Sequence, residues 1–324
     1  MRAMIVKEWC EPKDMQLVEL PDPEPRRGQV VIDVRAIGCN FFDILMAQGK
    51  YQVRPPLPFS PGGEIAGVVR SVGQDVDSVK PGDRVFAMLG WGGFASVATA
   101  PAAGVARMPD SMSFEHGAAF GIVYQTSYFG LVYRAALQAG ETLLVHAAAG
   151  GVGLAAVQIG RALGARLLAT AGSPAKLAIA REHGAEEAYD YTNPDWVEQV
   201  RAATDGRGAD VIYDPVGGDV FDLSTKCIAF GGRLLVIGFA SGRIPSIQVN
   251  RVLLKNISIV GLHWGAYRQH DPTRIPAAMT ELFRMYERGA IRPAISSTHK
   301  LEDAAAALDE IASRRSTGKV LLIP

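Results

Sequence analysis

The sequence contains little cysteine, no excess of either charge and no long apolar run. Only Cys10, Cys39 and Cys227 occur among 324 residues, and none forms a C-x-x-C pair, which argues against a disulfide framework and favours a reducing compartment. Lys plus Arg and Asp plus Glu both total 33, so nothing in the charge favours nucleic acid or an acidic membrane as a partner. No segment approaches the roughly 20 apolar residues that span a bilayer. We therefore expect a cytoplasmic protein without nucleic-acid or membrane partners.

The chain changes character at about residue 110. Before it, short β-rich runs alternate with Gly- and Pro-rich turns such as Pro61-Gly62-Gly63, a pattern typical of a small barrel or sandwich. From about residue 113 to 262, apolar runs alternate with helical stretches, which predicts βαβ units and a parallel sheet. The last part, residues 275–324, ends in a strand over 319–323 that we expect to return to the first domain. The predicted class is α/β.

The most informative segment covers residues 140–158, where an apolar strand leads through a glycine loop into an amphipathic helix. The loop, residues 147–153, reads Ala-Ala-Ala-Gly-Gly-Val-Gly. Glycines let a pyrophosphate approach the backbone, and the N-terminus of the helix offers unpaired N–H groups and the positive end of its dipole. A βα turn that binds nothing uses glycines too, but the flanking strand and helix favour a dinucleotide site.

The residues after the next strand distinguish the two nicotinamide cofactors. NAD-specific folds place Asp or Glu about 20 residues beyond the glycines, where the carboxylate binds the ribose 2′-hydroxyl. Here the strand over 166–170 is followed by Gly172 and Ser173 without a carboxylate, and Lys176 can neutralise a 2′-phosphate. A surface lysine on a helix is common, but the missing acid and the added base together favour NADPH over NADH.

These residues resemble the quinone oxidoreductase/zeta-crystallin family. The run from Gly140 to Arg161 matches the signature of that family at every fixed position, and the resemblance covers nearly the whole chain. The family's N-F-x-D segment, G-x-E turn and closing strand are matched by Asn40-Phe41-Phe42-Asp43, Pro61-Gly62-Gly63-Glu64 and Thr317-Gly318-Lys319-Val320. Residues 261–265, Gly-Leu-His-Trp-Gly, are most similar to the quinone oxidoreductase-like subgroup.

The resemblance implies the architecture of the medium-chain dehydrogenase/reductase superfamily. Residues 1–120 and 263–324 would form a GroES-like β-barrel domain, and residues 121–262 a doubly wound Rossmann domain that binds NADPH, with the cofactor between the two. The resemblance also implies a homodimer, in which the strand over 257–260 pairs with its twin and extends the sheet.

Cofactor contacts are implied residue by residue. The 2′-phosphate contacts fall on Lys176, Tyr191 and Arg314, although the adjacent Arg315 is basic as well and the choice between the two arginines stays open. Thr126 is expected to contact nicotinamide or phosphate, and His263 to line the nicotinamide site. The full set of expected cofactor-binding residues is Asn40, Thr126, Ala149, Gly150, Gly151, Val152, Gly153, Gly172, Ser173, Lys176, Tyr191, Gly238, His263, Trp264 and Arg314.

No metal site is expected. Zinc alcohol dehydrogenases of the same superfamily bind the catalytic ion through Cys, His and a further Cys or Asp. This sequence has Asn40 at the first of these positions and Gly63 at the histidine position, and the four-cysteine structural zinc lobe has no counterpart. Cys39 is adjacent, but in a strand its side chain points to the opposite face.

A zinc-free reductase needs a substrate that is already a good hydride acceptor, such as a quinone or another activated carbonyl compound. The protein then has chiefly to position two flat rings and exclude water. We assign catalytic roles to Asn40, as a hydrogen-bond donor to nicotinamide or to the substrate oxygen, and to Tyr51, as a hydrogen-bond donor or proton source. A tyrosine at the rim without a role explains Tyr51 equally well. His146, at the end of a strand, is expected to support packing.

Three functions remain open from the sequence. The first is an NADPH-dependent quinone reductase, the second an NADPH-dependent alkenal or enoyl reductase, and the third a non-catalytic, crystallin-like NADPH-binding protein. The first two are hard to separate because the acceptor would lie among the loops over 49–58 and 267–275. The intact glycines and the 2′-phosphate set argue against the third.

Overall fold

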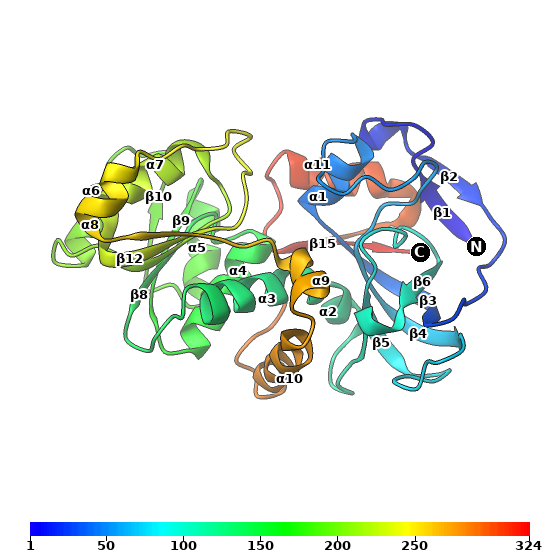
Figure 1. Cartoon of the computed structure of the whole chain (residues 1–324). Helices are drawn as coiled ribbons and strands as arrows, with labels where there is room; N and C mark the ends of the chain where they lie inside the picture. The colour runs from blue at the N-terminus through cyan, green and yellow to red at the C-terminus, as the bar shows by residue number, and fades with distance from the viewer. The chain divides into compact units, whose positions relative to one another are not determined.

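The computed structural model describes all 324 residues, which divide into two compact units. The first unit combines Met1–Ile122 with Pro293–Pro324, and the second is Val123–Arg292. The chain therefore leaves the first unit once and returns to it, as expected (Figure 1). None of the helices combines the length and the apolar character that crossing a membrane requires.

One long strand organises the first unit. β3 (Gln29–Cys39) pairs along one edge with β4 (Glu64–Val72). Its other edge is shared, because β6 (Val97–Pro101) pairs with the first half of β3 and β15 (Lys319–Ile323) pairs with its last residues. The other strands are β5 (Arg84–Met88), β7 (Val105–Arg107), β14 (Ile295–Lys300) and a separate antiparallel pair, β1 (Arg2–Ile5) and β2 (Gln16–Glu19).

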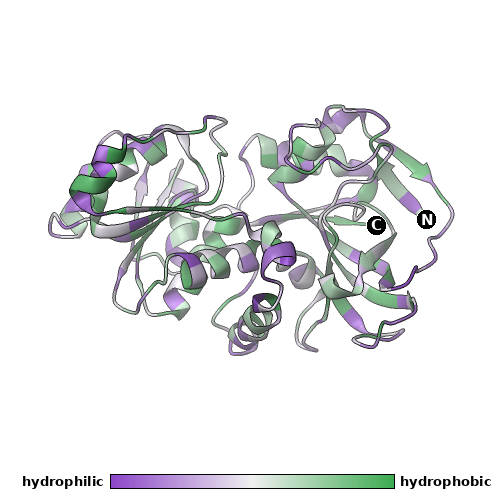
Figure 2. Cartoon of the chain, in the orientation of Figure 1, coloured by the Kyte–Doolittle hydropathy of each residue, from purple (hydrophilic) through white to green (hydrophobic).

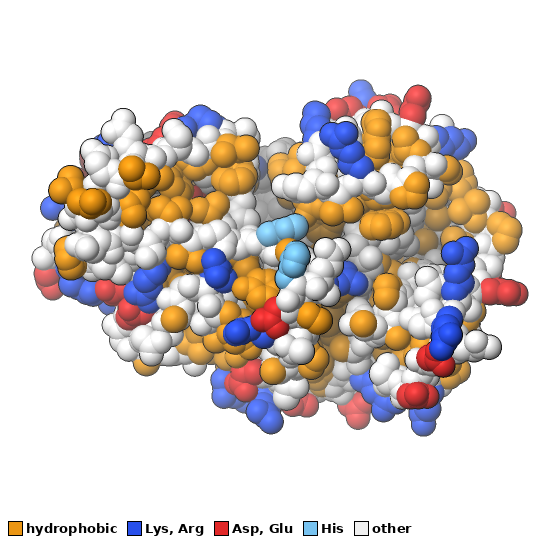
Figure 3. All heavy atoms as spheres, in the orientation of Figure 1, with side chains coloured by type: hydrophobic (Ala, Val, Ile, Leu, Met, Phe, Trp, Pro, Cys, Tyr) orange, Lys and Arg blue, Asp and Glu red, His pale blue; other side chains and the backbone are white.

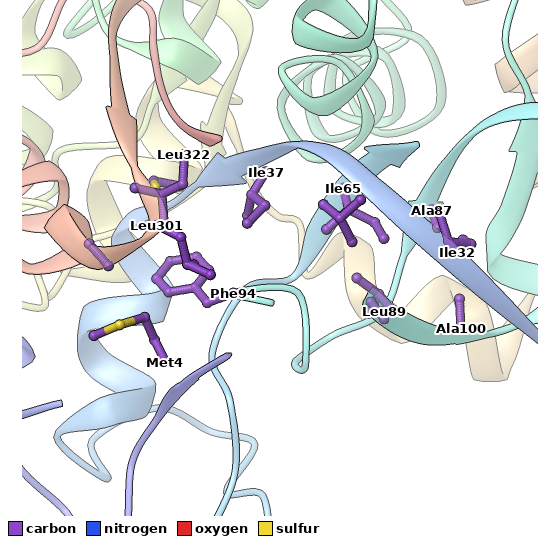
Figure 4. Close-up of a cluster of buried hydrophobic side chains, with 14 of the residues drawn as sticks. Met4, Ile32, Ile37, Ile65, Ala87, Leu89, Phe94, Ala100, Leu301 and Leu322 are labelled. Atoms are coloured by element: carbon purple, nitrogen blue, oxygen red, sulfur yellow. The ribbon is translucent and has the colours of Figure 1, made fainter. Parts of the chain in front are cut away.

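Hydrophobic side chains from segments far apart in the sequence form the core of the first unit. Its core contains fully buried side chains from β3, β4 and the C-terminal segment, among them Ile37, Ile65 and Leu322, with the ring of Phe94 beside them (Figure 4). Burial of each such side chain contributes roughly 1.5–3 kcal/mol. The helices are α1 (Phe41–Ala47), α2 (Phe114–Ala118), α11 (Ala304–Ala312), and the 3₁₀ turns Pro12–Asp14, Ala102–Gly104 and Leu301–Asp303.

The second unit is a six-stranded parallel sheet in the order β10-β9-β8-β11-β12-β13. From β8 the chain runs outward through β9 to β10, then returns to the other side of β8 and runs outward again from β11 to β13. This is the doubly wound order in which ligands bind at the carboxyl ends of the two central strands. The strands are β8 (Thr142–Val145), β9 (Arg166–Ala171), β10 (Glu187–Asp190), β11 (Ala209–Asp214), β12 (Ile228–Val236) and β13 (Ser258–Gly261).

Helices connect these parallel strands, as βαβ crossovers require. The two central strands, β8 and β11, are buried along almost their whole length, and the helices carry both polar and apolar residues (Figure 2). The connecting helices are α4 (Gly151–Ala162), α5 (Pro174–Glu182), α6 (Trp196–Ala203), α7 (Gly218–Cys227) and α8 (Val249–Lys255). The remaining helices are α3 (Gly121–Tyr128), a π-helical continuation over Phe129–Arg134, the 3₁₀ turn Trp264–Ala266, α9 (Tyr267–His270) and α10 (Arg274–Glu287).

The structure draws the second domain boundary after Arg292 and not after Leu262, where we expected it. The intervening residues pack on the second unit. The ring of Phe129 lies 4.7 Å from that of Tyr267, and Arg292 exchanges two backbone hydrogen bonds with the side chain of Gln158. The sequence pattern shows that 263–292 is helical but does not show which core the helices cover.

Candidate functional site

The glycine loop lies where the sequence predicted it, between β8 and α4. Gly150 is the N-cap of α4, and the first backbone bond of the helix type runs from the N–H of Leu154 to the carbonyl of Gly150. The N–H groups of Gly151, Val152 and Gly153 therefore precede the helical ladder and remain available to an anion. This loop follows the strand at which the sheet order reverses, so the loop stands at the ligand-binding edge of the sheet.

Contacts at two of the glycines support a dinucleotide at this loop. A Cβ added at Gly153 would lie 2.3 Å from the carbonyl oxygen of Ala147, so only glycine allows the loop to fold back tightly on itself. A Cβ added at Gly150 would meet only that same oxygen, at 3.3 Å, so the space on the Cβ side of Gly150 is otherwise open. The tight fold at Gly153 and the open side of Gly150 fit a pyrophosphate cradle.

Four of the expected 2′-phosphate residues gather at the ends of β9 and β10. Gly172 follows β9 and packs on the ring of Tyr191, since an added Cβ would lie 2.9 Å from the phenol oxygen. Ser173 caps α5 by accepting a hydrogen bond from the N–H of Lys176, with an N···O distance of 3.4 Å. No carboxylate ends β9, so this corner offers a cation and hydroxyl groups to a ligand.

Arg314, the fifth expected phosphate contact, belongs to the first unit. It follows α11 with a φ of +57°, and its N–H donates to the carbonyl of Ile311. The predicted joint contact of Arg314 with Lys176 and Tyr191 stays a prediction.

The other expected cofactor residues of the second unit lie at the same edge of its sheet. Thr126 is half-buried in α3, and the hydroxyl of its neighbour Ser127 donates to the carbonyl of Val152 at 3.0 Å, which fixes α3 against the glycine loop. Gly238 follows β12 beside Pro215, which follows β11. His263 and Trp264 follow β13.

Two buried polar atoms near these residues have no partner within the protein. They are the indole N–H of Trp264 and the side-chain carbonyl of Gln125, in residues that are 8% and 1% exposed. Buried polar atoms are almost always hydrogen-bonded, so each of these two atoms lacks the partner that such an atom usually has.

The three motifs of the first unit meet at one buried cluster. Asn40 follows β3, Glu64 begins β4 and Lys319 begins β15, the two strands that flank the end of β3. The ammonium of Lys319 donates to Glu64 Oε1, to Asn40 Oδ1 and to the carbonyl of Cys39, each at 2.7 Å. The Nδ2 of Asn40 donates to Glu64 Oε1 at 2.9 Å and to the carbonyl of Gly38 at 3.2 Å.

Asp43 and Tyr51 lie next to this cluster. The carboxylate of Asp43 is fully buried and accepts hydrogen bonds from the N–H groups of Asn40 and Gly62, yet burial raises its pKa to about 7. The ring of Tyr51 stacks on Phe42 with centroids 5.4 Å apart. Burial raises the pKa of the Tyr51 phenol as well, with a smaller contribution from the charge of Asp43.

Among the residues expected to have a structural role, His146 is completely buried and neutral. Its Nδ1 lies 2.8 Å from the hydroxyl of Thr170 and its Nε2 lies 2.8 Å from that of Ser224. Ser224 itself donates to the carbonyl of Val220, so His146 donates from Nε2 and accepts at Nδ1. Burial lowers the pKa of His146 to about 3.

Sequence reasoning missed two features of the site. It recognised Glu64 and Lys319 only as motif members, because the pairing of β3 with both β4 and β15 brings them together across 255 residues. It also missed Arg268 in α9, a half-buried guanidinium for which no hydrogen bond, ion pair or ring contact is found and whose pKa is lowered by burial. The signal in both cases is burial, which one sequence does not display.

These features define a dinucleotide-binding α/β protein with a second, barrel-like domain. Residues 26–110 match the alcohol dehydrogenase GroES-like domain, and residues 151–284 match the zinc-binding dehydrogenase family. The name of this second family mentions zinc, although no group of three or more His, Cys, Asp or Glu side chains in the structure is arranged to hold a metal ion.

Known proteins narrow the class. A quinone oxidoreductase-like protein 2 homolog of Nematostella vectensis is 43% identical over 298 residues, which cover 91% of this chain and 81% of the relative. Human quinone oxidoreductase is 34% identical over 100% of this chain and 98% of its own. The structure of Escherichia coli quinone oxidoreductase complexed with NADPH has a TM-score of 0.92 at 31% identity and covers all of both chains. The chain belongs to the quinone oxidoreductase family of the medium-chain dehydrogenases/reductases.

Proposed function

We propose that this protein is an NADPH-dependent reductase that transfers hydride to a quinone without a zinc ion. The observation that carries the proposal is the second unit's ligand-binding edge. There an open glycine loop begins α4, and Gly172, Ser173, Lys176 and Tyr191 occupy the corner where an NAD-specific fold has a carboxylate. The NADPH complex of the similar E. coli enzyme supports this assignment.

The residues of this chain would hold the cofactor by three kinds of contact. The N–H groups of 151–153 would bind the pyrophosphate, Lys176 and Tyr191 the 2′-phosphate, and the unpaired atoms of Gln125 and Trp264 the carboxamide. NADPH, when bound, supplies the hydride. A glycine-to-valine substitution at Gly153 should abolish NADPH binding, because the added carbons meet the backbone of Ala147.

On the acceptor side, we assign Tyr51 to hydrogen bonding of the quinone oxygen. Its raised pKa keeps the phenol protonated at neutral pH, so it can donate a hydrogen bond to an oxygen that gains negative charge. Phe42 stacks on the ring and restricts its orientation. Asn40 is poorly suited to this role, because both of its amide hydrogens already have acceptors within the protein.

The acceptor class is tested by following NADPH absorbance with a quinone, an enone and an alcohol in parallel. Oxidation with the quinone but not the enone supports the proposal. Oxidation with the enone alone would identify an alkenal or enoyl reductase instead. Tight NADPH binding without any turnover would identify a binding protein.

Charge at the Asn40 cluster supports the absence of zinc. The ammonium of Lys319 already lies 2.7 Å from both Asn40 and Glu64, so a divalent cation at these residues would be repelled by a resident positive charge. Elemental analysis of the purified enzyme should find no stoichiometric zinc, and a chelator should not reduce quinone reduction. Stoichiometric zinc whose removal abolishes activity would contradict this part of the proposal.

We further propose that the protein is a homodimer through the second unit. β13 is an edge strand, and the adjacent α8 exposes Val249, Leu253 and Leu254 by 72–80%. Hydrophobic side chains are visible on this side of the second unit, at the left of Figure 3. An unpaired edge beside an apolar face is a suitable surface for an isologous contact with a second copy. Light scattering should show a dimer, and Leu253→Glu should shift it to monomer; a monomeric wild type would contradict the proposal.

The free state of all three cysteines supports the expected cytoplasmic location.

A further inference from the structure

A buried chain of hydrogen bonds connects the end of β8 with the end of β9, inside the second unit. His146 directly follows β8, and Thr170 is the next-to-last residue of β9. The Nδ1 of His146 lies 2.8 Å from the hydroxyl of Thr170, and its Nε2 lies 2.8 Å from the hydroxyl of Ser224 in α7. All three side chains are completely buried.

The hydrogen bonds of this chain have one direction. The hydroxyl of Ser224 donates its single hydrogen to the carbonyl of Val220 at 2.6 Å, so it accepts from Nε2 of His146. A neutral imidazole that donates from Nε2 accepts at Nδ1, and the hydroxyl of Thr170 is therefore the donor there. Every polar group of the chain has a partner, which fixes the orientation of the Thr170 side chain.

Packing alone does not explain these polar side chains. The surrounding core of the second unit is apolar, with Leu144, Leu168 and Ile212 completely buried and the ring of Trp196 packed edge-on against His146 at 5.3 Å. Apolar side chains would fill the same positions without the cost of removing polar groups from water. A fully paired buried network instead specifies one geometry of the elements that it joins.

The network lies where the sheet no longer holds the two strands together. The printed register of β8 with β9 ends at Val145 and Ala169. One residue further on, the N–H of Ala148 in the glycine loop donates to the carbonyl of Thr170 at 3.0 Å, and the Thr170 hydroxyl donates to His146. Thr170 is thus held to the glycine-loop side through both its backbone and its side chain.

The separation of these two segments matters for a ligand with two phosphate groups. Gly172 and Ser173, at the proposed 2′-phosphate corner, follow Thr170 by two and three residues. The adenosine ribose of NADPH carries the pyrophosphate on its 5′ carbon and the third phosphate on its 2′ carbon, so one sugar ring sets the distance between the two groups. NADH lacks the 2′-phosphate and has no second phosphate group to match.

We propose that His146 and Thr170 are positioning residues that set the spacing between the glycine loop and the 2′-phosphate corner and so favour NADPH over NADH. The inference rests on the proposed function. Both side chains are completely buried, so they act through the backbone that they hold and not by contact with the cofactor.

The test removes one hydroxyl. Thr170→Val keeps the shape of the β-branched side chain but cannot donate to His146. Calorimetry should show that the substitution weakens NADPH binding about fivefold, the effect of one neutral hydrogen bond, and leaves NADH binding unchanged. Thr170→Ser restores a hydroxyl and should recover most of the preference for NADPH. A folded Thr170→Val variant that keeps the wild-type preference would overturn the inference.

A matched control addresses general loss of stability. Thr204 is a second buried threonine of the same unit, whose hydroxyl donates to the carbonyl of Val200 and accepts from the N–H of Gly208, each at 2.9 Å. Thr204→Val should lower the melting temperature and leave the preference for NADPH intact. Equal losses of preference in the two variants would assign the effect to stability and overturn the positioning role.

Adenosine 2′-monophosphate separates a change in spacing from damage to the corner itself. This fragment carries the 2′-phosphate but no pyrophosphate, so its binding does not depend on the distance between the two sites. Its dissociation constant should be the same for wild type and Thr170→Val. If the fragment loses affinity by the same factor as NADPH, the corner itself has changed and the spacing role is wrong.

A measurement on the wild type keeps the inference testable if Thr170→Val does not fold. In NMR spectra, the hydroxyl proton of Thr170 should exchange slowly with solvent, both with and without NADPH, and the imidazole of His146 should be protonated at Nε2. A rapidly exchanging hydroxyl, or an imidazole protonated at Nδ1, would overturn the inference. If wild type binds NADPH and NADH equally tightly, the proposed function fails in its choice of cofactor; if it prefers NADPH and Thr170→Val does too, only this inference fails.

Discussion

Gly38 lies directly against the carboxylate of Glu64. A Cβ added at Gly38 would lie 2.7 Å from Glu64 Oε1 and 2.2 Å from the carbonyl oxygen of Ala118, closer than van der Waals contact allows. The residue that precedes Cys39 is therefore glycine because the backbone carbonyl of Ala118 and the side chain of Glu64 occupy the space where its own side chain would be.

Gly38→Ala should destabilise the protein by about 1–3 kcal/mol, the usual cost of forcing extra carbon into a packed site. Chemical denaturation measures the effect. Gly130→Ala is the control, since its added Cβ would meet its nearest neighbours at an ordinary 3.5 Å. Equal stability of both variants would contradict the assigned packing.

The buried His146 predicts a loss of stability in acid. The pKa of this imidazole is about 3 in the folded protein and about 6.5 when exposed, so between these values the unfolded chain binds a proton that the folded protein excludes. The contribution of His146 to the free energy of unfolding is fully present above pH 6.5. It falls as the pH falls below that value, by up to about 1.4 kcal/mol per pH unit.

Denaturation of wild type and His146→Gln across this pH range isolates that contribution. The comparison is needed because Asp43, whose pKa is raised to about 7, acts in the opposite sense: its folded form keeps a proton that the unfolded chain loses above about pH 4, so stability falls as pH rises through this window. The difference between the two proteins should shrink as the pH drops. A constant difference would show that His146 is not excluded from protonation.

Arg268 predicts a preference for acceptors that carry negative charge. Its guanidinium is half-buried without a partner, in a segment that begins at the ligand-binding edge of the sheet. Arg268→Met should raise the KM for a sulfonated naphthoquinone about tenfold and leave that for an uncharged one nearly unchanged, since charge-assisted hydrogen bonds are the stronger kind. Arg274→Met is the control, because Arg274 is already bound to Asp271. Equal effects on both quinones would reject the assignment.

Local sequence features predicted much of the second unit. Three features describe contacts between segments that are neighbours along the chain: the alternation of apolar and helical runs, the small residues around 147–153 and the missing acid after β9. The strand order that reverses at β8 and the packing of Gly172 on Tyr191 were therefore accessible from the pattern and the resemblance. The assignment of 263–292 to the second unit was not accessible, because an amphipathic helix shows that it covers a core but not which one.

The chemistry at Asn40 could not be read from the sequence for a related reason. The motif residues were recognised, yet the hydrogen-bonding state of an amide depends on which groups surround it in space. Glu64 and Lys319 approach Asn40 only after β4 and β15 pair with the same strand. Those contacts use both amide hydrogens, so none is left for the donor role that we expected of Asn40.

The most direct test of the proposed function measures the dissociation constants of NADPH and NADH for wild type and Lys176→Ala. Lys176 is assigned to the 2′-phosphate, which only NADPH carries. The substitution should weaken NADPH binding by about tenfold, within the range of a charge-assisted contact, and leave NADH binding unchanged. Equal losses for the two cofactors, or no loss for either, would contradict the assignment of this edge of the sheet to NADPH.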